Sequence, residues 1–320
     1  MRSAYLVFVI KIESYKQKKS FYFLLSRLFI LFESYKQFRR GIHCVYLAIF
    51  GAETRRRFSL LTTTRRRTTM LQHRLREALI QREKRSARRQ LTLLPSTAVD
   101  FSSNDFLSLS TSPSLRGRLL ALLQEAPAEQ PFASGGSRLL DGNSRTAEEL
   151  EAYIARVHEA PSGLLFNSGF DANVGVLECL PQPGDVVLYD EHVHASVHEG
   201  MRLSRAGERR AFRHSSPASL EQVLREVLAA DPGLAGGQRS VFVAVESVYS
   251  MDGDIAPLRE LVAVVDRLVA GHGYFVVDEA HATGVLGEKG TGVVQAVGLQ
   301  QRMLVRVHTF GKALASHGGT

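Results

Sequence analysis

A lysine lies on a glycine-containing turn near the end of the sequence, at position 312. Residues 303–307 before it are apolar and predict a strand, so Lys312 is expected where a parallel strand ends. Ligands bind at this edge of open α/β sheets. A lysine amine there can form a Schiff base with a cofactor aldehyde if its pKa is lowered. The same pattern is also typical of a solvated turn, so the interpretation depends on partners elsewhere in the chain.

One such partner is Asp278, which ends the apolar run of residues 274–278 and is expected to be poorly solvated. A buried carboxylate needs a cationic partner, and a protonated pyridine nitrogen would provide one. A helix cap or a salt bridge is the alternative for an isolated acid. His281 follows on the same edge, where its imidazole would reach the hydroxyl of such a ring. Together with Lys312, these residues predict a site for a pyridine-type cofactor.

A phosphate site is indicated by Gly169 and Phe170, which lie between an expected strand and an expected helix. Free backbone N–H groups at the start of a helix bind phosphate. Glycine at such a turn is common, so the signal is weak by itself. Thr309, three residues before Lys312, can add a hydroxyl to the same phosphate.

His194 follows the strand expected at residues 185–190 and would stack on the face of a cofactor ring. His192 lies two residues before it, and two histidines beside acidic residues raise the alternative of a metal site. No HExxH motif and no cysteine partner accompanies them, so the sequence predicts no metal.

These residues must be positioned by the elements between them, and the body of the chain alternates short apolar runs with longer amphipathic ones. Its Val-rich runs, such as residues 241–246, suit a parallel sheet covered on both faces. Two capped helices are expected, one from Thr146 and one from Ser216 with Pro217 at its first position. A short strand and turn is expected at residues 99–107.

Charge divides the chain in two. Residues 1–90 hold 22 of the 40 Lys and Arg but only 5 of the 32 Asp and Glu, which leaves 18 basic and 27 acidic groups in the rest. The main part of the chain therefore lacks the basic balance of a nucleic-acid binder. The two cysteines give no metal spacing and no disulfide framework, which favours a reducing compartment.

The first 69 residues differ in composition from the rest. Residues 20–32 are apolar but too short to span a bilayer, and residues 55–67 carry arginine runs in a Ser/Thr-rich stretch, as organelle transit segments do. We expect residues 1–69 to be disordered or to arise from a mis-chosen start codon, with Met70 as a natural start. Residues 70–98 are expected to form a basic N-terminal helix. The expected location is the cytoplasm or an organelle, either mitochondrion or peroxisome.

Three motifs give the sequence a family resemblance: residues 309–318, 278–284 and 246–254, with residues 102–107 as a fourth point of likeness. They resemble those of the α-oxoamine synthases, which are pyridoxal-phosphate enzymes, over roughly residues 70–320. The resemblance implies a three-layer α/β sandwich with a mostly parallel central sheet, the large domain of the fold type I transferases, over residues 99–320. It also implies a homodimer and a small C-terminal domain. The chain ends eight residues after Lys312, so we expect a large domain truncated after this lysine.

Carried onto this chain, the resemblance assigns the catalytic and cofactor-binding residues. These are Lys312 as the Schiff-base lysine, Asp278 at the pyridine nitrogen, His281 and Ser250 near the ring hydroxyl, His194 on the ring face, and Gly169, Phe170 and Thr309 at the phosphate. Asn104 and Ser137 would face the substrate.

The reaction that the resemblance implies joins an amino acid to an acyl-CoA with loss of carbon dioxide. The likeness is greatest to the members that serve biotin synthesis, which implies L-alanine and pimeloyl-CoA. The alternatives are members that make 5-aminolevulinate, 2-amino-3-ketobutyrate or sphingoid bases, and a non-catalytic partner subunit. No nucleic-acid partner and no firm membrane association is expected, and the absence of a GxGxxG motif argues against a dinucleotide binder.

Overall fold

The computed structural model describes residues 69–320 except 94, 96, 128–132 and 270. The chain divides into two compact units, residues 1–96 and 97–320, close to the boundary expected at Val99. In the first unit the described helix is α4 (Met70–Lys84), which Thr69 caps by a reciprocal bond with Gln72. The helix expected over residues 70–98 therefore ends early, because Ser86 adopts a left-handed backbone with φ of 53°.

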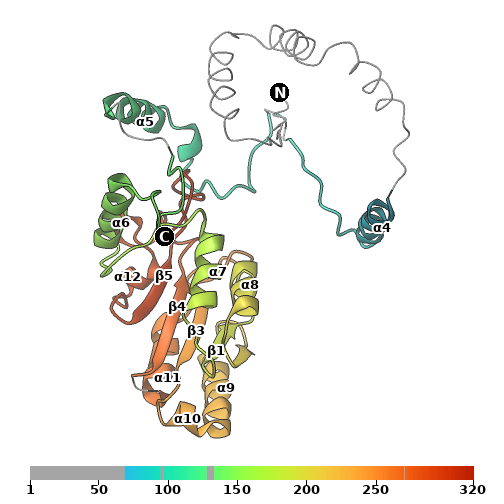
Figure 1. Ribbon diagram of the computed structural model, residues 1–320, viewed down its shortest axis with the longest axis vertical. Helices are drawn as coiled ribbons and strands as arrows, with labels where there is room; N and C mark the ends of the chain where they lie inside the picture. Colours follow the sequence, from blue (N-terminus) through green and yellow to red (C-terminus); the bar gives the residue numbers. More distant parts are fainter. Residues whose placement is uncertain (1–68, 94, 96, 128–132, 270) are drawn as a thin grey trace, which may run out of the picture. The chain divides into compact units, whose positions relative to one another are not determined.

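Five strands form one parallel sheet in the order β2-β1-β3-β4-β5 (Figure 1). The strands are β1 (Val186–Asp190), β2 (Glu208–Phe212), β3 (Val241–Glu246), β4 (Gly273–Asp278) and β5 (Met303–Val307). Because all five run the same way, their carboxyl ends meet at one edge. In particular, Glu246 at the end of β3 pairs in register with Asp278 at the end of β4.

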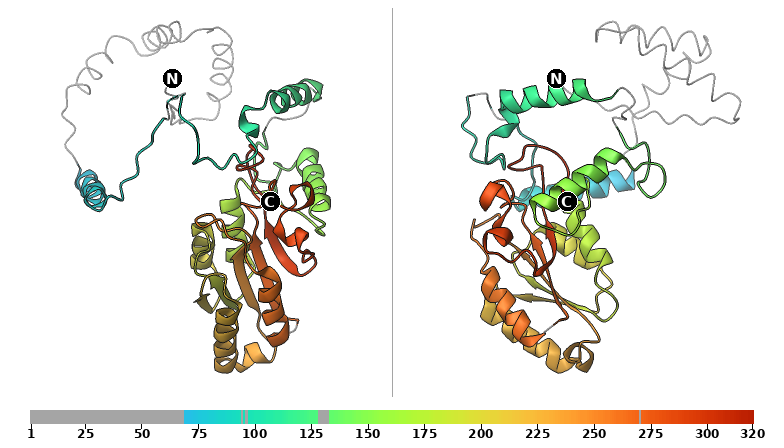
Figure 2. Two further views of the ribbon diagram at one scale, coloured as in Figure 1. Left: turned by 180° about the vertical axis from the view of Figure 1, so that it is seen from behind. Right: turned by 90° about the vertical axis from the view of Figure 1, so that its left-hand side faces the viewer.

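Helices cover both faces of the sheet, as the Val-rich strands predict (Figure 2). On one face, Leu188, Val243 and Phe275 pack in a core cluster with α9 (Pro217–Ala230) and α11 (Leu258–Leu268). On the other, Val187, Ala244 and Val276 pack with α7 (Gly169–Cys179) and α8 (Ala195–Leu203). Successive strand residues point to opposite faces, so each central strand contributes to both cores. The three-layer sandwich with a parallel central sheet is confirmed.

The structure describes four further helices in the larger unit. They are α5 (Pro113–Glu125), α6 (Arg145–Val157), α10 (Pro232–Ala235) and α12 (Val293–Ala296), with 3-10 turns at Leu109–Thr111 and Glu288–Gly290. The cap expected at Ser216 is confirmed, since its hydroxyl accepts a bond from the N–H of Ser219. The cap expected at Thr146 is wrong. Ser144 caps α6 instead, because its extended backbone lets its hydroxyl accept from the N–H of Ala147.

The short strand expected at residues 99–107 is also wrong, because this segment forms turns. The carboxylate of Asp100 accepts bonds from the backbone N–H groups of Ser102 and Ser103, and that of Asp105 accepts from Leu109 and Ser110. Such side-chain bonds to the backbone hold turns and compete with strand pairing.

The last residues of the chain pair with two segments that are distant in sequence. Gly319 exchanges backbone hydrogen bonds with Phe166 on one side, and Thr320 exchanges them with His308 on the other. The strand expected just before Gly169 is reduced to isolated bridges, at Phe166 and Ser168. This pairing ties the loop that carries Lys312 to the segment that leads into α7.

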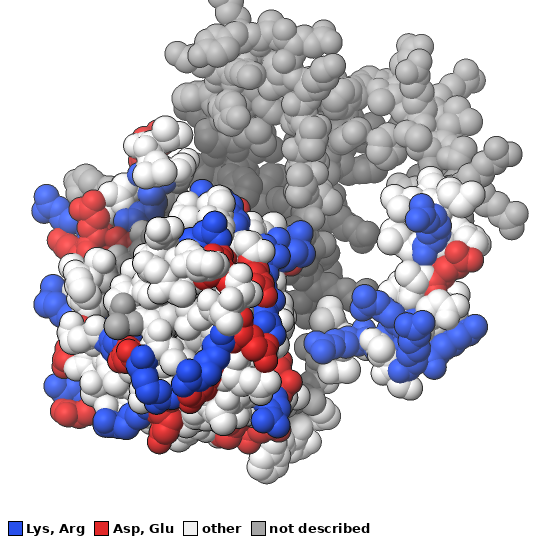
Figure 3. Space-filling model, turned by 90° about the horizontal axis from the view of Figure 1, so that it is seen from below, with Lys and Arg blue, Asp and Glu red and all other residues white. Residues whose placement is uncertain are grey.

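Lys and Arg side chains lie among Asp and Glu side chains on the visible face of the larger unit (Figure 3). The ion pairs of this unit include Arg225–Glu221 and Arg302–Asp266. No described helix is long and apolar enough to cross a membrane. The transit-like stretch at residues 55–67 and the apolar run at residues 20–32 lie outside the described residues. The same holds for the segment 1–69 expected to be disordered, apart from Thr69, which caps α4.

Candidate active site

Asp278 lies at the carboxyl end of β4 with only 6% of its surface exposed, as the sequence predicts. Its Oδ2 accepts a 2.6 Å hydrogen bond from the side-chain amide of Asn173 in α7, and its Oδ1 accepts a 2.8 Å bond from the N–H of Ala280. Each carboxylate oxygen has a further lone pair. The acid is thus held in a fixed orientation and can still accept a bond from a cationic group.

Lys312 follows β5 and is half-buried in its loop. Burial lowers the pKa of its ammonium group, and the nearby charges of Asp278 and Glu246 act in the opposite direction. A lowered pKa increases the fraction of neutral amine, which is the form that acts as a nucleophile or a base. The predicted lysine thus lies within range of the charge of the predicted acid, and the structure shows no direct ion pair between them among the described residues.

Glu246 is a member of this cluster that the sequence-based site did not include. It ends β3, is 3% exposed and lies beside Asp278 in the sheet register. Burial, and secondarily the charge of Asp278, raises the pKa of Glu246 to about 8. The signal was present in the sequence, because Glu246 is an acid that closes a continuous apolar run.

The two predicted histidines join the same cluster. His194 caps α8, where its Nδ1 lies 2.8 Å from the hydroxyl of Ser196. Burial lowers the pKa of His194, and burial with the charge of Lys312 lowers that of His281 to about 4. Both rings are therefore neutral hydrogen-bonding and stacking groups at neutral pH. Phe170 meets His194 edge-on at 6.1 Å between ring centroids.

The start of α7 forms a compact corner with the loop after β5. A Cβ on Gly169 would lie 3.1 Å from the Cβ of Thr309, which is closer than ordinary packing allows. Ser168 caps the helix through the N–H of Asp171. The N–H groups of Gly169 and Phe170 belong to the first turn, where a helix offers no internal partner. The corner is thus suited to an anion.

Three predicted residues are not joined to the cluster by their side chains. Ser250, Asn104 and Ser137 are exposed. Within the described residues no hydrogen bond links their side chains to Lys312 or Asp278. Their assignment stays a prediction.

A family model with the description aminotransferase class I and II matches residues 96–320 of the chain. The chain belongs to this family. Within it, the chain is 68% identical over 245 residues to a protein of Emericella nidulans named 8-amino-7-oxononanoate synthase, which covers 76% of this chain and 60% of that protein. The likeness to the α-oxoamine synthases is thereby confirmed.

Two solved structures of this aminotransferase family share the fold. A Sphingomonas wittichii serine palmitoyltransferase superposes with a TM-score of 0.58 at 31% identity, covering 68% of this chain and 50% of that one. An 8-amino-7-oxononanoate synthase from Francisella tularensis gives 0.55 at 25% identity, covering 70% and 58%. The chain therefore spans between half and two thirds of the length of these relatives.

The cluster of this family member fits pyridoxal phosphate on three observations. Asp278 is buried and keeps free lone pairs for a ring N–H. Lys312 is an amine with a lowered pKa. The corner between Gly169 and Thr309 is tightly packed, with 3.1 Å from a Cβ on Gly169 to the Cβ of Thr309, and it presents the start of a helix.

Proposed function

We propose that this chain carries the catalytic centre of a pyridoxal-phosphate-dependent acyltransferase that makes 8-amino-7-oxononanoate, in biotin synthesis, from L-alanine and pimeloyl-CoA. The observation that carries the proposal is that Lys312 lies close enough to the buried Asp278 at the sheet edge for the charge of Asp278 to act on its pKa, in a chain 68% identical to a synthase of that name. In the reaction the α-carbon of alanine bonds to the thioester carbonyl carbon, CoA leaves as its thiol, and the alanine carboxyl group leaves as carbon dioxide.

When bound, pyridoxal phosphate supplies an electron-withdrawing ring that stabilises negative charge at the α-carbon of the amino acid. The residues that would hold it are Asp278 at the ring nitrogen, Lys312 at the aldehyde carbon, His281 and Ser250 at the ring hydroxyl, His194 on the ring face, and Gly169, Phe170 and Thr309 at the phosphate.

Lys312 moves the proton in this proposal. Its neutral amine takes the α-proton of the amino acid, and the resulting ammonium returns a proton to the product carbon after carbon dioxide has left. Burial favours the neutral amine, and the nearby carboxylate of Asp278 favours the ammonium that follows. These two effects oppose each other, which suits a group that must be a neutral amine in one step and an ammonium in the next.

Asp278 would stabilise the positive charge of a protonated ring nitrogen. Asn173 and the N–H of Ala280 donate to its two oxygens, which fixes the orientation of the carboxylate. The oriented acid would pair with a protonated ring nitrogen. The carboxylate acts from a fixed position, so no reorganisation is needed when charge develops.

The substrate side is the part of the proposal that rests on resemblance. Asn104 and Ser137 would face the substrates, and both are exposed. The family resemblance also implies a homodimer, and exposed site residues such as His194 leave a surface that a second subunit would cover. Location in the cytoplasm or an organelle stays a prediction.

A specific observation favours a second candidate, serine palmitoyltransferase-like activity, because structures of that enzyme superpose with TM-scores of 0.58. The higher identity to the fungal synthase favours alanine.

Two measurements test the proposal. Purified chain mixed with pyridoxal phosphate is expected to show a yellow, borohydride-trappable adduct, which peptide mapping places on Lys312 and which Lys312→Ala abolishes. Product identification with alanine, glycine or serine against a panel of acyl-CoAs then defines the substrates. Failure to form the adduct would overturn the cofactor assignment, and turnover of serine or glycine without alanine would overturn the choice of reaction.

A further inference from the structure

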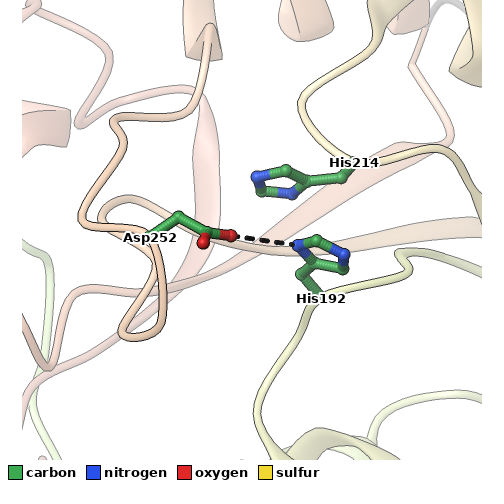
Figure 4. A group of neighbouring side chains, drawn as sticks. All are labelled: His192, His214 and Asp252. Atoms are coloured by element: carbon green, nitrogen blue, oxygen red, sulfur yellow. Dashed lines mark ion pairs between the residues drawn. The ribbon is translucent and has the colours of Figure 1, made fainter.

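A second group of side chains converges at the same sheet edge, away from Lys312. His192 lies in the loop after β1, His214 in the loop after β2, and Asp252 in the loop after β3. These strands are neighbours in the order β2-β1-β3, so their loops meet. Figure 4 shows the imidazoles of His192 and His214 face to face and the carboxylate of Asp252 beside His192.

The distances are those of potential ligands. The ring centroids of His192 and His214 lie 4.1 Å apart, and Oδ2 of Asp252 lies 3.7 Å from Nδ1 of His192. One ligand atom from each of the three residues lies within 4.8 Å of the others. Around a tetrahedral zinc ion, donors are separated by about 3.3 Å. The side chains of His192 and Asp252 are 47% and 63% exposed, so both are free to close this gap by small rotations.

The orientation of the His214 ring is fixed by a buried carboxylate at its Nδ1. Its Nδ1 lies 2.9 Å from Oδ1 of Asp190, which is fully buried, and the same oxygen accepts a 2.9 Å bond from the N–H of His192. A carboxylate on one nitrogen of a histidine is the usual second partner of a metal-bound imidazole, because it fixes the tautomer. The other nitrogen of His214, Nε2, lies 3.1 Å from Oδ2 of Asp254, so a metal ion would bind there in exchange for this contact. Asp190 thus holds the ring of His214 and the backbone of His192 at once.

The carboxylates around the two imidazole rings favour the binding of a cation. Oδ2 of Asp254 lies 3.1 Å from Nε2 of His214, and its Oδ1 is buried without a hydrogen-bond partner among the described residues. Asp190, Asp252 and Asp254 surround the two imidazoles, and within the described residues each of them forms ion pairs with these histidines alone. A proton shared between His214 and Asp254 satisfies one contact. A divalent cation would neutralise more of this negative charge.

We propose that His192, His214 and Asp252 form a binding site for a divalent transition metal of the zinc class. Two imidazole nitrogens and one carboxylate oxygen are ligands that zinc and its neighbours accept, unlike the all-oxygen sets of magnesium and calcium. Asp254 or a water completes four ligands. The ion would cross-link the three loops, one of which leads to His194 and another of which carries Ser250. In the sequence His192 is closest to His194, whereas in the structure Nδ1 of His194 faces Ser196 and the ring of His214 stacks on that of His192.

The test is equilibrium dialysis of the whole purified chain against zinc and cobalt, with cobalt absorption as the geometric readout. We expect one saturable ion per chain, a tetrahedral cobalt spectrum and a rise in melting temperature with zinc. The double variant His192→Asn/Asp252→Asn should bind at least ten-fold more weakly. These exposed substitutions avoid the buried Asp190 contact of His214.

Two matched variants separate this site from other sources of metal binding. His198→Asn removes an exposed imidazole of α8 and should bind as the parent does. Lys312→Ala should also bind as the parent does, because the cofactor lysine is not a ligand. Equal affinity of the parent and the double variant, or no saturable binding by the parent, would overturn the proposal.

Discussion

The side-chain amide of Asn173 donates a 2.6 Å hydrogen bond to the carboxylate of Asp278, across 105 residues of sequence. Both side chains are buried, and the same amide nitrogen also lies 3.0 Å from the hydroxyl of Ser196 at the start of α8. Asn173 therefore connects the strand that ends in Asp278 to the two helices on one face of the sheet. It holds the acid that would face a pyridine nitrogen, although it carries no charge itself.

Asn173→Ala is expected to weaken pyridoxal phosphate binding by about ten-fold or more. A hydrogen bond to a charged group contributes about 1.5–3 kcal/mol, and 1.4 kcal/mol corresponds to a factor of ten. The measurement is an absorbance titration of cofactor binding. Asn143→Ala is the control, because Asn143 makes a similar 2.6 Å bond to Glu148 on the exposed surface. Equal affinities of the two variants would contradict the role of Asn173.

Gly169→Ala is expected to destabilise the chain by about 1–3 kcal/mol and to weaken cofactor binding. The new methyl group would press on the Cβ of Thr309 at 3.1 Å, and both residues border the proposed phosphate corner. Urea unfolding measures the first effect and cofactor titration the second.

Gly117→Ala is the matched control for that substitution. Gly117 lies inside α5, and no atom lies within 4 Å of the position that its new methyl group would take, so alanine should stabilise this helix by up to about 1 kcal/mol. If Gly169→Ala behaved as Gly117→Ala does, the corner would not be as closely packed as its geometry indicates.

The sequence predicted the parts of the site that lie at strand ends. Asp278 and Lys312 both follow continuous apolar runs, and a parallel sheet necessarily brings such positions to one edge. The bounds of β3, β5 and α9 followed from apolar runs and from the Ser216 cap for the same local reason.

Other features depended on contacts that no local pattern encodes. Asn173 lies within α7, where an asparagine has no special spacing, and its role arises only when α7 packs beside β4. The cap at Ser144 and the turn held by Asp100 reflect competition among several Ser, Thr and Asp side chains for the same backbone N–H groups. Composition identifies such competitors without deciding which one forms the bond.

The stacked pair of His158 and His308 should make the fold sensitive to acid. Their rings lie 3.7 Å apart, and burial lowers the pKa of His158 to about 4 and that of His308 well below its usual range. Unfolded histidines bind protons near pH 6.5, so between pH 6.5 and 4 the unfolded state holds more protons. Stability is therefore present above pH 6.5 and is lost as pH falls through this window.

His158→Asn is expected to flatten that dependence by up to about 3 kcal/mol between pH 7 and pH 4, measured from urea midpoints. The variant will start from a lower stability at pH 7, because the ring stack is lost, so the slope is the quantity compared. His198→Asn, on the exposed surface of α8, should keep the parent slope. A parent whose stability does not change from pH 7 to pH 5 would exclude this explanation.

Glu246 should make the free energy of unfolding fall as the pH rises, which is the opposite of the effect of the two histidines. Burial beside Asp278 raises its pKa to about 8, above the value near 4.5 of an unperturbed glutamate, so the folded chain holds the extra proton between these values. Its contribution to stability is complete below pH 4.5 and is lost as pH rises towards 8, with a slope of at most about 1.4 kcal/mol per pH unit. Glu246→Gln replaces the protonated acid by a neutral group of the same shape and should remove this slope. Glu178→Gln, on the exposed side of α7, should leave it unchanged. Urea midpoints of the cofactor-free chain between pH 5 and 8 measure both, and parallel curves for the parent and Glu246→Gln would show that Glu246 is already ionised in the fold.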